Sequence, residues 1–220
     1  MARFIFKELD KIKKKILSLG ALVEERVRMT STAVENRDAV IAQKIIENDW
    51  EIDEMEVDIE EECLKILALH QPVAIDLRFI VAVVKINNDL ERIGDQAVNI
   101  AERVVIMSKR PEMGFIFDYQ PMSEKTQAML KMSLDALVNL DVDLAFKVIT
   151  LDDEVDAMKE DAYDKIKEAI KLNPDRVGYL INLLLISRHL ERLADHCTNI
   201  AEEVIYLIEG EIVRHGDFNG

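Results

Sequence analysis

Residues that interrupt helices are scarce in this chain. Its 220 residues include only 7 glycines and 4 prolines, and no glycine lies between Ala21 and Ile93. This scarcity leaves little room for the tight turns of a strand-rich fold. Together with the abundance of leucine, isoleucine, alanine, glutamate and lysine, it favours an all-α protein.

Cysteines and long apolar runs are also few. The two cysteines, Cys63 and Cys197, are isolated in the sequence, so a disulfide framework is excluded and reduced thiols are expected. The longest apolar stretches, residues 79–84 and 183–186, are far too short to span a bilayer. The first residues lack the apolar core of a secretory signal. We therefore expect a cytoplasmic protein that does not insert into a membrane.

Basic residues are outnumbered by acidic ones. The chain has 28 lysines and arginines against 43 aspartates and glutamates, a formal net charge of -15. A general nucleic-acid binder is excluded, because phosphate contacts need clusters of lysine and arginine and the only such cluster, residues 11–15, is short. The acidity instead suits cation binding or basic partners.

The chain contains an internal repeat that retains polar residues. Eight of the sixteen positions in residues 87–102 are identical to those in residues 187–202. The retained polar residues are Glu91, Arg92, Asp95, Asn99 and Glu102, matched by Glu191, Arg192, Asp195, Asn199 and Glu202. A second pair of segments matches at an offset of 103 residues, with Asp49, Glu51 and Asp53 against Asp152, Glu154 and Asp156. Because polar positions of helical repeats usually drift, something other than packing is expected to require them.

Six helices are predicted, at about residues 4–36, 38–69, 74–108, 123–139, 143–171 and 175–209. The third and sixth share an apolar seam at spacings of three and four: Ile86, Leu90, Ile93, Ala97, Ile100 and Val104, then Ile186, Leu190, Leu193, Cys197, Ile200 and Val204. Long helices with short connections favour antiparallel neighbours. The expected architecture is two tandem homologous three-helix bundles, residues 1–110 and 122–210, with a linker at 111–121 and a polar tail at 211–220. The bundles are joined end to end or side by side.

Acidic pairs at i, i+4 spacing suggest a cation site in each half. Asp53 and Glu91 each lie 19 residues from the turn at Pro72, so antiparallel helices would bring them to one height. Carboxylates gathered there repel one another, and hard cations such as iron, manganese, magnesium or calcium relieve that repulsion. The predicted metal ligands are Asp49, Asp53, Glu91, Asp95, Asp152, Asp156, Glu191 and Asp195. The alternatives are ion pairing with a partner protein and a plain solvated surface.

Four further polar residues accompany these rows. Arg92 and Arg192 could clamp the carboxylates, and Asn99 and Asn199 extend the rows by one turn. His189 and His196 flank the second row, but their counterparts are Asp89 and Gln96, so solvated or hydrogen-bonded histidines are expected rather than metal ligands or phosphoacceptors. Cys197 is expected in the core. No nucleophile–base pair, phosphate-binding glycine loop or dinucleotide fingerprint occurs, so we predict no catalytic residue, no organic cofactor and no enzyme.

Two longer motifs resemble those of a known family. Leu69-x-Gln71-Pro72-Val73-Ala74-x-Asp76-Leu77-Arg78 with residues 89–101 is similar to the first half of the PhoU family, regulators of bacterial phosphate transport. Residues 189–203 and the ending at 210–215 resemble its second half. The resemblance covers essentially the whole chain.

The resemblance implies two three-helix bundles whose acidic motifs bind metal ions or multinuclear iron clusters, with manganese or magnesium as alternatives. It implies negative control of the phosphate-starvation response. The protein would be a cytoplasmic adaptor between the ATPase subunit of the phosphate ABC transporter and a membrane sensor histidine kinase, gathered at the inner membrane through these partners, and possible as a homodimer. The competing hypotheses are a phosphatase-like metalloenzyme with carboxylate-bound metal, and phosphotransfer through His189 or His196.

Overall fold

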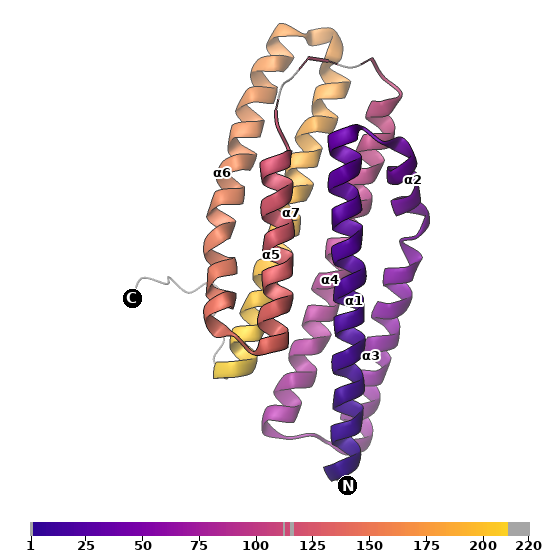
Figure 1. Cartoon of the computed structure of the whole chain (residues 1–220), viewed down its shortest axis with the longest axis vertical. Coiled ribbons are helices and arrows are strands. Elements are labelled where there is room, and N and C mark those ends of the chain that lie inside the picture. The colour runs from indigo at the N-terminus through magenta and orange to yellow at the C-terminus, as the bar shows by residue number, and fades with distance from the viewer. Residues whose placement is uncertain (1, 112, 115–116, 211–220) are drawn as a thin grey trace.

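The structure, a computed structural model, describes residues 2–111, 113–114 and 117–210. Within these residues every regular element is helical, which confirms the all-α prediction (Figure 1). The elements are α1 (Ala2–Asn36), α2 (Ala39–Glu47), α3 (Trp50–His70), α4 (Ala74–Ser108), α5 (Gln120–Asn139), α6 (Val142–Leu172), a 3₁₀ turn η1 (Pro174–Arg176) and α7 (Val177–Glu209).

Side-chain caps and special backbone conformations set several helix ends. The Asp38 carboxylate accepts hydrogen bonds from the backbone amides of Val40 and Ile41 at 2.8 and 3.0 Å and starts α2. Asp141 caps α6 in the same way through the amide of Leu144 at 2.9 Å. Gly210 ends α7 with φ of +78°, the left-handed conformation that glycine adopts without strain.

The predicted continuous helix over residues 38–69 is wrong at one point. Asn48 and Asp49 form a turn that separates α2 from α3. Arg26 of α1 stabilises this break, because its guanidinium donates to the carbonyls of Ile45 at 3.3 Å and Asn48 at 3.1 Å. It also pairs with Glu51 at 2.9 Å and is only 4% exposed. The carbonyls left open at the end of α2 therefore have a buried partner.

Two other helix starts differ slightly from the prediction. α5 begins at Gln120 rather than Ser123, with Pro121 in its first turn, where proline needs no amide partner. The last helix begins with η1, and α7 itself starts at Val177. The predicted tail, residues 211–220, and linker residues 112 and 115–116 lie outside the described residues. Among the described helices, none combines the length and apolarity needed to cross a membrane.

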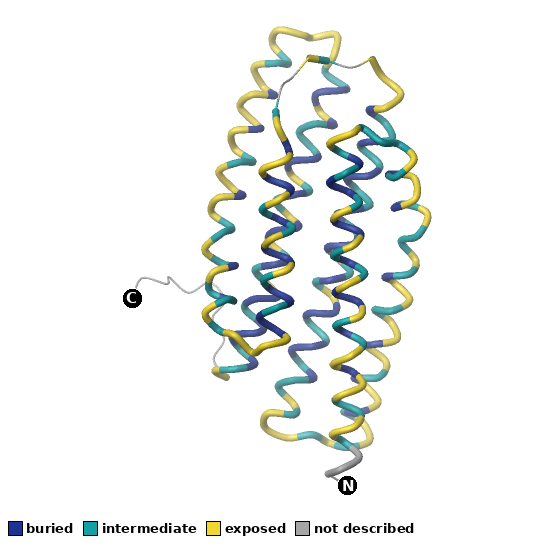
Figure 2. Tube along the Cα trace, in the orientation of Figure 1, coloured by how far each residue is buried: buried dark blue, intermediate teal, exposed yellow. Residues whose placement is uncertain are grey.

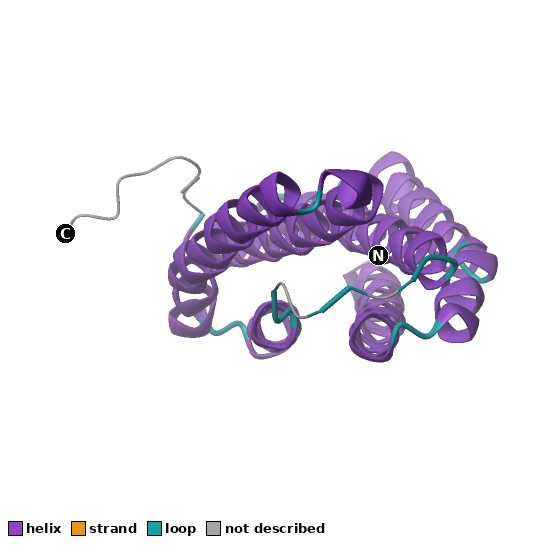
Figure 3. Cartoon of the chain, turned by 90° about the horizontal axis from the view of Figure 1, so that it is seen from above, coloured by secondary structure: helices purple, strands orange, loops and turns teal. Residues whose placement is uncertain are grey.

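The two bundles lie side by side. α1, α3 and α4 form the first, with α2 against α1 and α4, and α5, α6 and α7 form the second. α4 packs along α7, and α1 packs against α5 (Figure 1). Seen from above, the two groups of helices lie next to each other across the width of the molecule (Figure 3). The bundles are therefore joined laterally.

One hydrophobic core runs through both bundles. All twelve residues of the predicted seam on α4 and α7 are buried, which confirms the seam. Figure 2 shows the buried positions facing inward along every helix. Across the α4–α7 contact, the Lys85 ammonium donates to both carboxylate oxygens of Glu203 at 3.1 Å, and Glu203 is almost fully buried. Packing and a charged contact thus join the two halves.

Candidate functional site: two carboxylate clusters

The structure brings the first two acidic rows together. Asp49 precedes α3 and Asp53 lies in its first turn, while Glu91 and Asp95 lie one turn apart on α4, against which α3 packs. We call these four residues the first cluster. Gly94 permits the close approach, since a Cβ there would lie 2.9 Å from the Cδ1 atom of Ile52 on α3.

Electrostatics show that the carboxylates of the first cluster act on one another. Burial, followed by the charges of Asp53 and Asp95, raises the pKa of Asp49 above its ordinary value. Burial and the charge of Asp95 are the two largest causes that raise the pKa of Glu91. The negative charge of this cluster is therefore only partly neutralised.

Arg92 provides the nearest cation of α4 at this cluster. Its Nη1 atom donates to the Oδ2 atom of Asp95 at 3.2 Å, and its Nε atom lies 3.4 Å from the Oε2 atom of Glu91. The guanidinium is half-exposed, at the edge of the cluster. Glu91 Oε2 is buried without a hydrogen bond. Arg92 thus lies where it was predicted to clamp the carboxylates, but leaves one buried oxygen unsatisfied.

The second cluster consists of Asp152 and Asp156 on α6 with Glu191 and Asp195 on α7. Burial and the charges of Asp195 and Asp156 raise the pKa of Asp152 to about 7. Burial also raises the pKa of Asp195, with Glu191 and Asp156 as the next causes. The four residues therefore face one another, as in the first half.

Lys159 distinguishes the second cluster from the first. Its partly exposed ammonium donates to Glu191 at 3.0 Å and to Asp156 at 3.2 Å, so a cationic side chain of the protein itself bridges the two helices. At the repeat offset of 103 residues its counterpart is Glu56, whose pKa is raised by burial and by the charges of Glu60 and Asp53. Sequence analysis missed this residue, although extending the repeat alignment by one helical turn pairs Lys159 with Glu56.

The donor chemistry fits a hard cation better in the first cluster than in the second. Both clusters offer only carboxylate oxygens, the ligands that magnesium, calcium, manganese and iron accept. Within the described residues, however, no three histidine, cysteine, aspartate or glutamate side chains are arranged to hold a metal ion together. A bound cation would therefore require side-chain rearrangement, and in the second cluster it would compete with Lys159.

The remaining predicted residues lie at different places. Asn99 is half-buried one turn beyond Asp95 on α4. Asn199 donates to Asp89 at 3.1 Å and so faces the other bundle. Arg192 is exposed and lowers the pKa of His189 through its charge, after burial and Arg103.

Both histidines lie at the contact between α4 and α7. His189 Nδ1 is 2.8 Å from the side-chain oxygen of Gln96, and His196 Nδ1 is 2.9 Å from Asp89 Oδ1. Since Asp89 matches His189 and Gln96 matches His196 in the repeat, the two contacts are related by the internal symmetry. This placement gives the histidines a structural role between the bundles.

Comparison with known proteins decides the family. The PhoU domain matches residues 16–104 and again residues 120–204, which together include both clusters. The chain belongs to the PhoU family. The match to each half explains the internal repeat and agrees with the resemblance seen in the sequence.

PhoU relatives match almost the whole chain. The phosphate-specific transport system accessory protein PhoU homolog of Aquifex aeolicus is 38% identical over 211 residues, 96% of each chain. The PhoU protein of Escherichia coli is 30% identical over 208 residues, 94% of this chain and 86% of that protein. The crystal structure of PhoU from Pseudomonas aeruginosa superposes with a TM-score of 0.89 at 36% identity, covering 93% of this chain and 99% of the other. The crystal structure of the phosphate transport system regulatory protein PhoU from Streptococcus pneumoniae superposes with a TM-score of 0.83 at 31% identity, covering 95% of this chain and 99% of the other. These names describe accessory and regulatory proteins, in agreement with the prediction that the chain is not an enzyme.

Proposed function

We propose that this chain is an accessory protein that regulates a phosphate-specific transport system. The observation that carries the proposal is the PhoU match to both repeats, supported by relatives of that name over nearly the full length. More specifically, we propose that the protein restrains the phosphate-starvation response. It would act in the cytoplasm, as an adaptor between the transporter's ATPase subunit and a sensor histidine kinase at the membrane.

We further propose that a cation binds the first cluster and tunes this adaptor. Asp49 and Asp53 would hold it from α3, and Glu91 and Asp95 from α4. The cation would supply positive charge that relieves the repulsion raising the pKa values of Asp49 and Glu91. By joining carboxylates of two helices, it would fix α3 on α4 and so the outer surface offered to partners. Iron is the first candidate, followed by manganese and magnesium.

The regulatory role is tested in a bacterium whose own copy of this gene is deleted. Deletion is expected to switch on a phosphate-starvation reporter in phosphate-rich medium, and the wild-type chain should restore repression. The tagged chain should retain the transporter ATPase and the sensor kinase of the same organism on an affinity column. A reporter unaffected by deletion would contradict the proposal. No feature described above favours the hydrolase alternative, which predicts phosphoester turnover that rises with added metal.

Cation binding is tested by elemental analysis of protein purified without chelator. We expect metal in the wild type, loss in Asp53→Asn/Glu91→Gln, and retention in the matched control Asp156→Asn/Glu191→Gln. Trp50, the only tryptophan, adjoins Asp49, so tryptophan-sensitised terbium luminescence reports the first cluster separately. A wild type that binds no iron, manganese, magnesium or terbium would disprove the cation proposal. The reporter and affinity assays would still test the regulatory role.

A further inference from the structure

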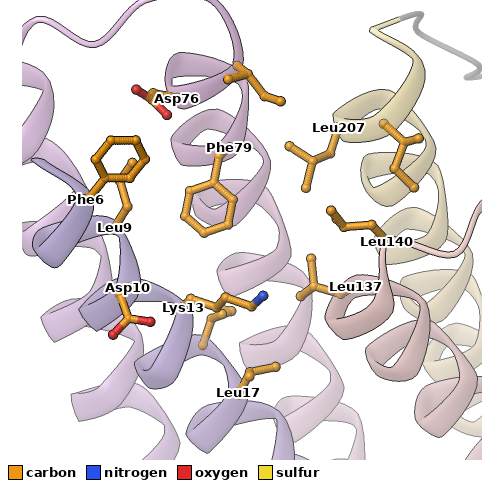
Figure 4. Close-up of a pocket in the computed structure, with 13 residues that line it drawn as sticks. Phe6, Leu9, Asp10, Lys13, Leu17, Asp76, Phe79, Leu137, Leu140 and Leu207 are labelled. Carbon is orange, nitrogen blue, oxygen red and sulfur yellow. The ribbon is translucent and has the colours of Figure 1, made fainter. Parts of the chain in front are cut away.

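An apolar groove opens between the two bundles, near the start of α1 and the end of α7 (Figure 4). Its volume is about 470 Å³, and its lining comes from α1, α4, the α5–α6 turn and α7. Three large side chains on it are strongly exposed: Phe6 at 65%, Ile75 at 62% and Leu140 at 55%. Contiguous exposed apolar surface of this kind usually marks a place that another group covers.

The chain leaves α7 at the rim of this groove. Leu207 and Ile208 line it, and two residues later Gly210 turns the backbone with φ of +78°. A Cβ at Gly210 would lie 2.1 Å from Nη1 of Arg78, so the Gly210 backbone lies against the guanidinium of this α4 residue. Arg78 is one helical turn from Ile75, which lines the groove. The described part of the chain therefore ends beside the apolar surface.

We propose that residues 211–220 bind in this groove, with Ile212 and Val213 as the apolar anchors. Ile212 follows Ile208 by four residues, and an extended chain spans about 3.3 Å per residue, so it can reach about 13 Å from a residue that already lines the groove. The two anchors are the only adjacent pair of aliphatic residues in this segment. Their burial would remove apolar surface of both partners from water.

Charged residues of both signs lie on the groove and in the segment. Asp10, Lys13 and Asp76 line the groove, and Figure 4 shows them beside the apolar side chains. In the segment, Glu211 precedes the anchors and Arg214 follows them. With the anchors buried, Arg214 would lie near the groove carboxylates and Glu211 near Lys13, so each charge would have an opposite charge within the groove.

Cross-linking tests which chain occupies the groove. The full-length Leu140→Cys/Val213→Cys variant is oxidised mildly, while the native Cys63 and Cys197 remain buried and inaccessible. We expect a disulfide within one chain. The matched control is Leu64→Cys/Val213→Cys, because Leu64 is 55% exposed like Leu140 but does not line the groove. Cross-links between chains would overturn the proposal and indicate that a second copy of the chain occupies the groove. Equal cross-linking in the Leu140→Cys and Leu64→Cys variants would overturn it by showing that the segment does not bind in the groove.

Dye binding provides an independent readout. The full-length Ile212→Asp/Val213→Asp variant and a chain ending at Gly210 should both bind more 8-anilinonaphthalene-1-sulfonate than the wild type, with enhanced and blue-shifted emission, because the groove is uncovered. Asn219→Asp adds a charge to the same segment outside the anchors and should leave the emission unchanged. Circular dichroism checks that each variant keeps its helices. Unchanged dye binding in the folded anchor variant would overturn the proposal.

Discussion

The carboxyl group of Asp152 has a strongly raised pKa in the second cluster. Burial and the surrounding carboxylates raise its pKa from an ordinary 3.8 to about 7. The folded protein therefore keeps a proton that the unfolded chain has already released. The stability that this proton provides is fully present below about pH 4 and is lost as the pH rises towards 7.

Replacing this carboxyl by an amide removes the titration. We expect Asp152→Asn to be more stable than the wild type at pH 8, with a smaller difference at pH 5. The effect is reduced by solvent screening, because the side chain is only partly buried. Urea unfolding of metal-free protein in EDTA at both pH values measures it. Asp143→Asn, in the first turn of α6, is the control. A variant whose stability difference is the same at both pH values would contradict the assigned pKa.

Lys159 and Glu56 permit a reciprocal experiment on the two clusters. Lys159→Glu gives the second cluster the charge pattern of the first, so an additional equivalent of metal per chain is expected. Glu56→Lys places an ammonium beside the first cluster and should abolish its metal binding. Elemental analysis after equilibration with excess metal and gel filtration counts the ions.

The control for this exchange is Lys165→Glu, the same charge change on α6. Lys165 pairs with Asp161 at 2.7 Å and makes no ion pair with the second cluster, so metal content should not change. Equal metal content in the wild type and Lys159→Glu would mean that the ammonium does not exclude a cation.

The facing carboxylate rows were predictable from the sequence, whereas the difference between the clusters, Lys159 in the second and Glu56 in the first, was not recognised. Spacing of i, i+4 and equal distances from the Pro72 turn are enough to place Asp53 and Glu91 at one height. The role of Lys159 depends on side-chain reach across α6 and α7, which periodicity does not describe. The ligation itself remains a prediction in both clusters.

At the scale of elements, the break between α2 and α3 is stabilised from another helix, by Arg26 of α1. We expect Arg26→Met to lower the free energy of unfolding by about 1–3 kcal/mol, because the buried carbonyl of Ile45 and the partly buried carbonyl of Asn48 lose their donor. The control Arg28→Met removes an exposed pair with Glu25 and should change stability by no more than about 0.5 kcal/mol. Urea unfolding followed by circular dichroism measures both. Equal effects would show that Arg26 does not stabilise the break.

At the contact of α3 with α4, a larger side chain on one helix faces a smaller residue on the other, and the sizes are redistributed in the second half. Ile52 packs on Gly94 in the first half, and the corresponding residues of the second half are Val155 and Ala194. One methyl group has in effect moved from one helix to the other. The missing Cβ of Gly94 therefore leaves room for the larger isoleucine side chain at position 52.

A double-mutant cycle tests this compensation. Gly94→Ala gains about 1 kcal/mol of helix propensity but loses about 1–3 kcal/mol to overpacking against Ile52. Ile52→Val alone should cost about 1 kcal/mol. The double variant should be more stable than the sum of the single effects predicts, by at least about 0.5 kcal/mol, when measured by urea unfolding. Strict additivity would show that the two sites do not interact.

Helix lengths were largely predictable because caps and prolines are local signals. Asp38, Asp141 and Gly210 lie within one or two residues of the ends that they define. The break at Asn48 was missed, since its stabilising partner lies 22 residues earlier, on another helix. A local apolar pattern carries no information about such a donor.

At the scale of the whole molecule, the lateral packing of the bundles makes one core from two repeats. The seam positions of α4 and α7 predicted buried faces, but the same faces would suit end-to-end or lateral bundles. The lateral arrangement is instead specified by polar contacts between the halves: Lys85 with Glu203, His196 with Asp89, and His189 with Gln96. Their residue types differ between the repeats, so comparing one repeat with the other could not reveal them.

A shared core predicts that the two halves unfold together. Leu193→Ala removes a buried side chain of α7 in the second bundle and should cost about 2–5 kcal/mol. Trp50, the only tryptophan, reports on the first bundle, while circular dichroism reports on all helices. Because the core is continuous, Leu193→Ala should shift the urea midpoints of tryptophan fluorescence and circular dichroism equally. The exposed replacement Leu172→Ala is the control and should shift neither. A fluorescence midpoint that stays in place while the dichroism curve divides into two transitions would show that the bundles fold as separate units.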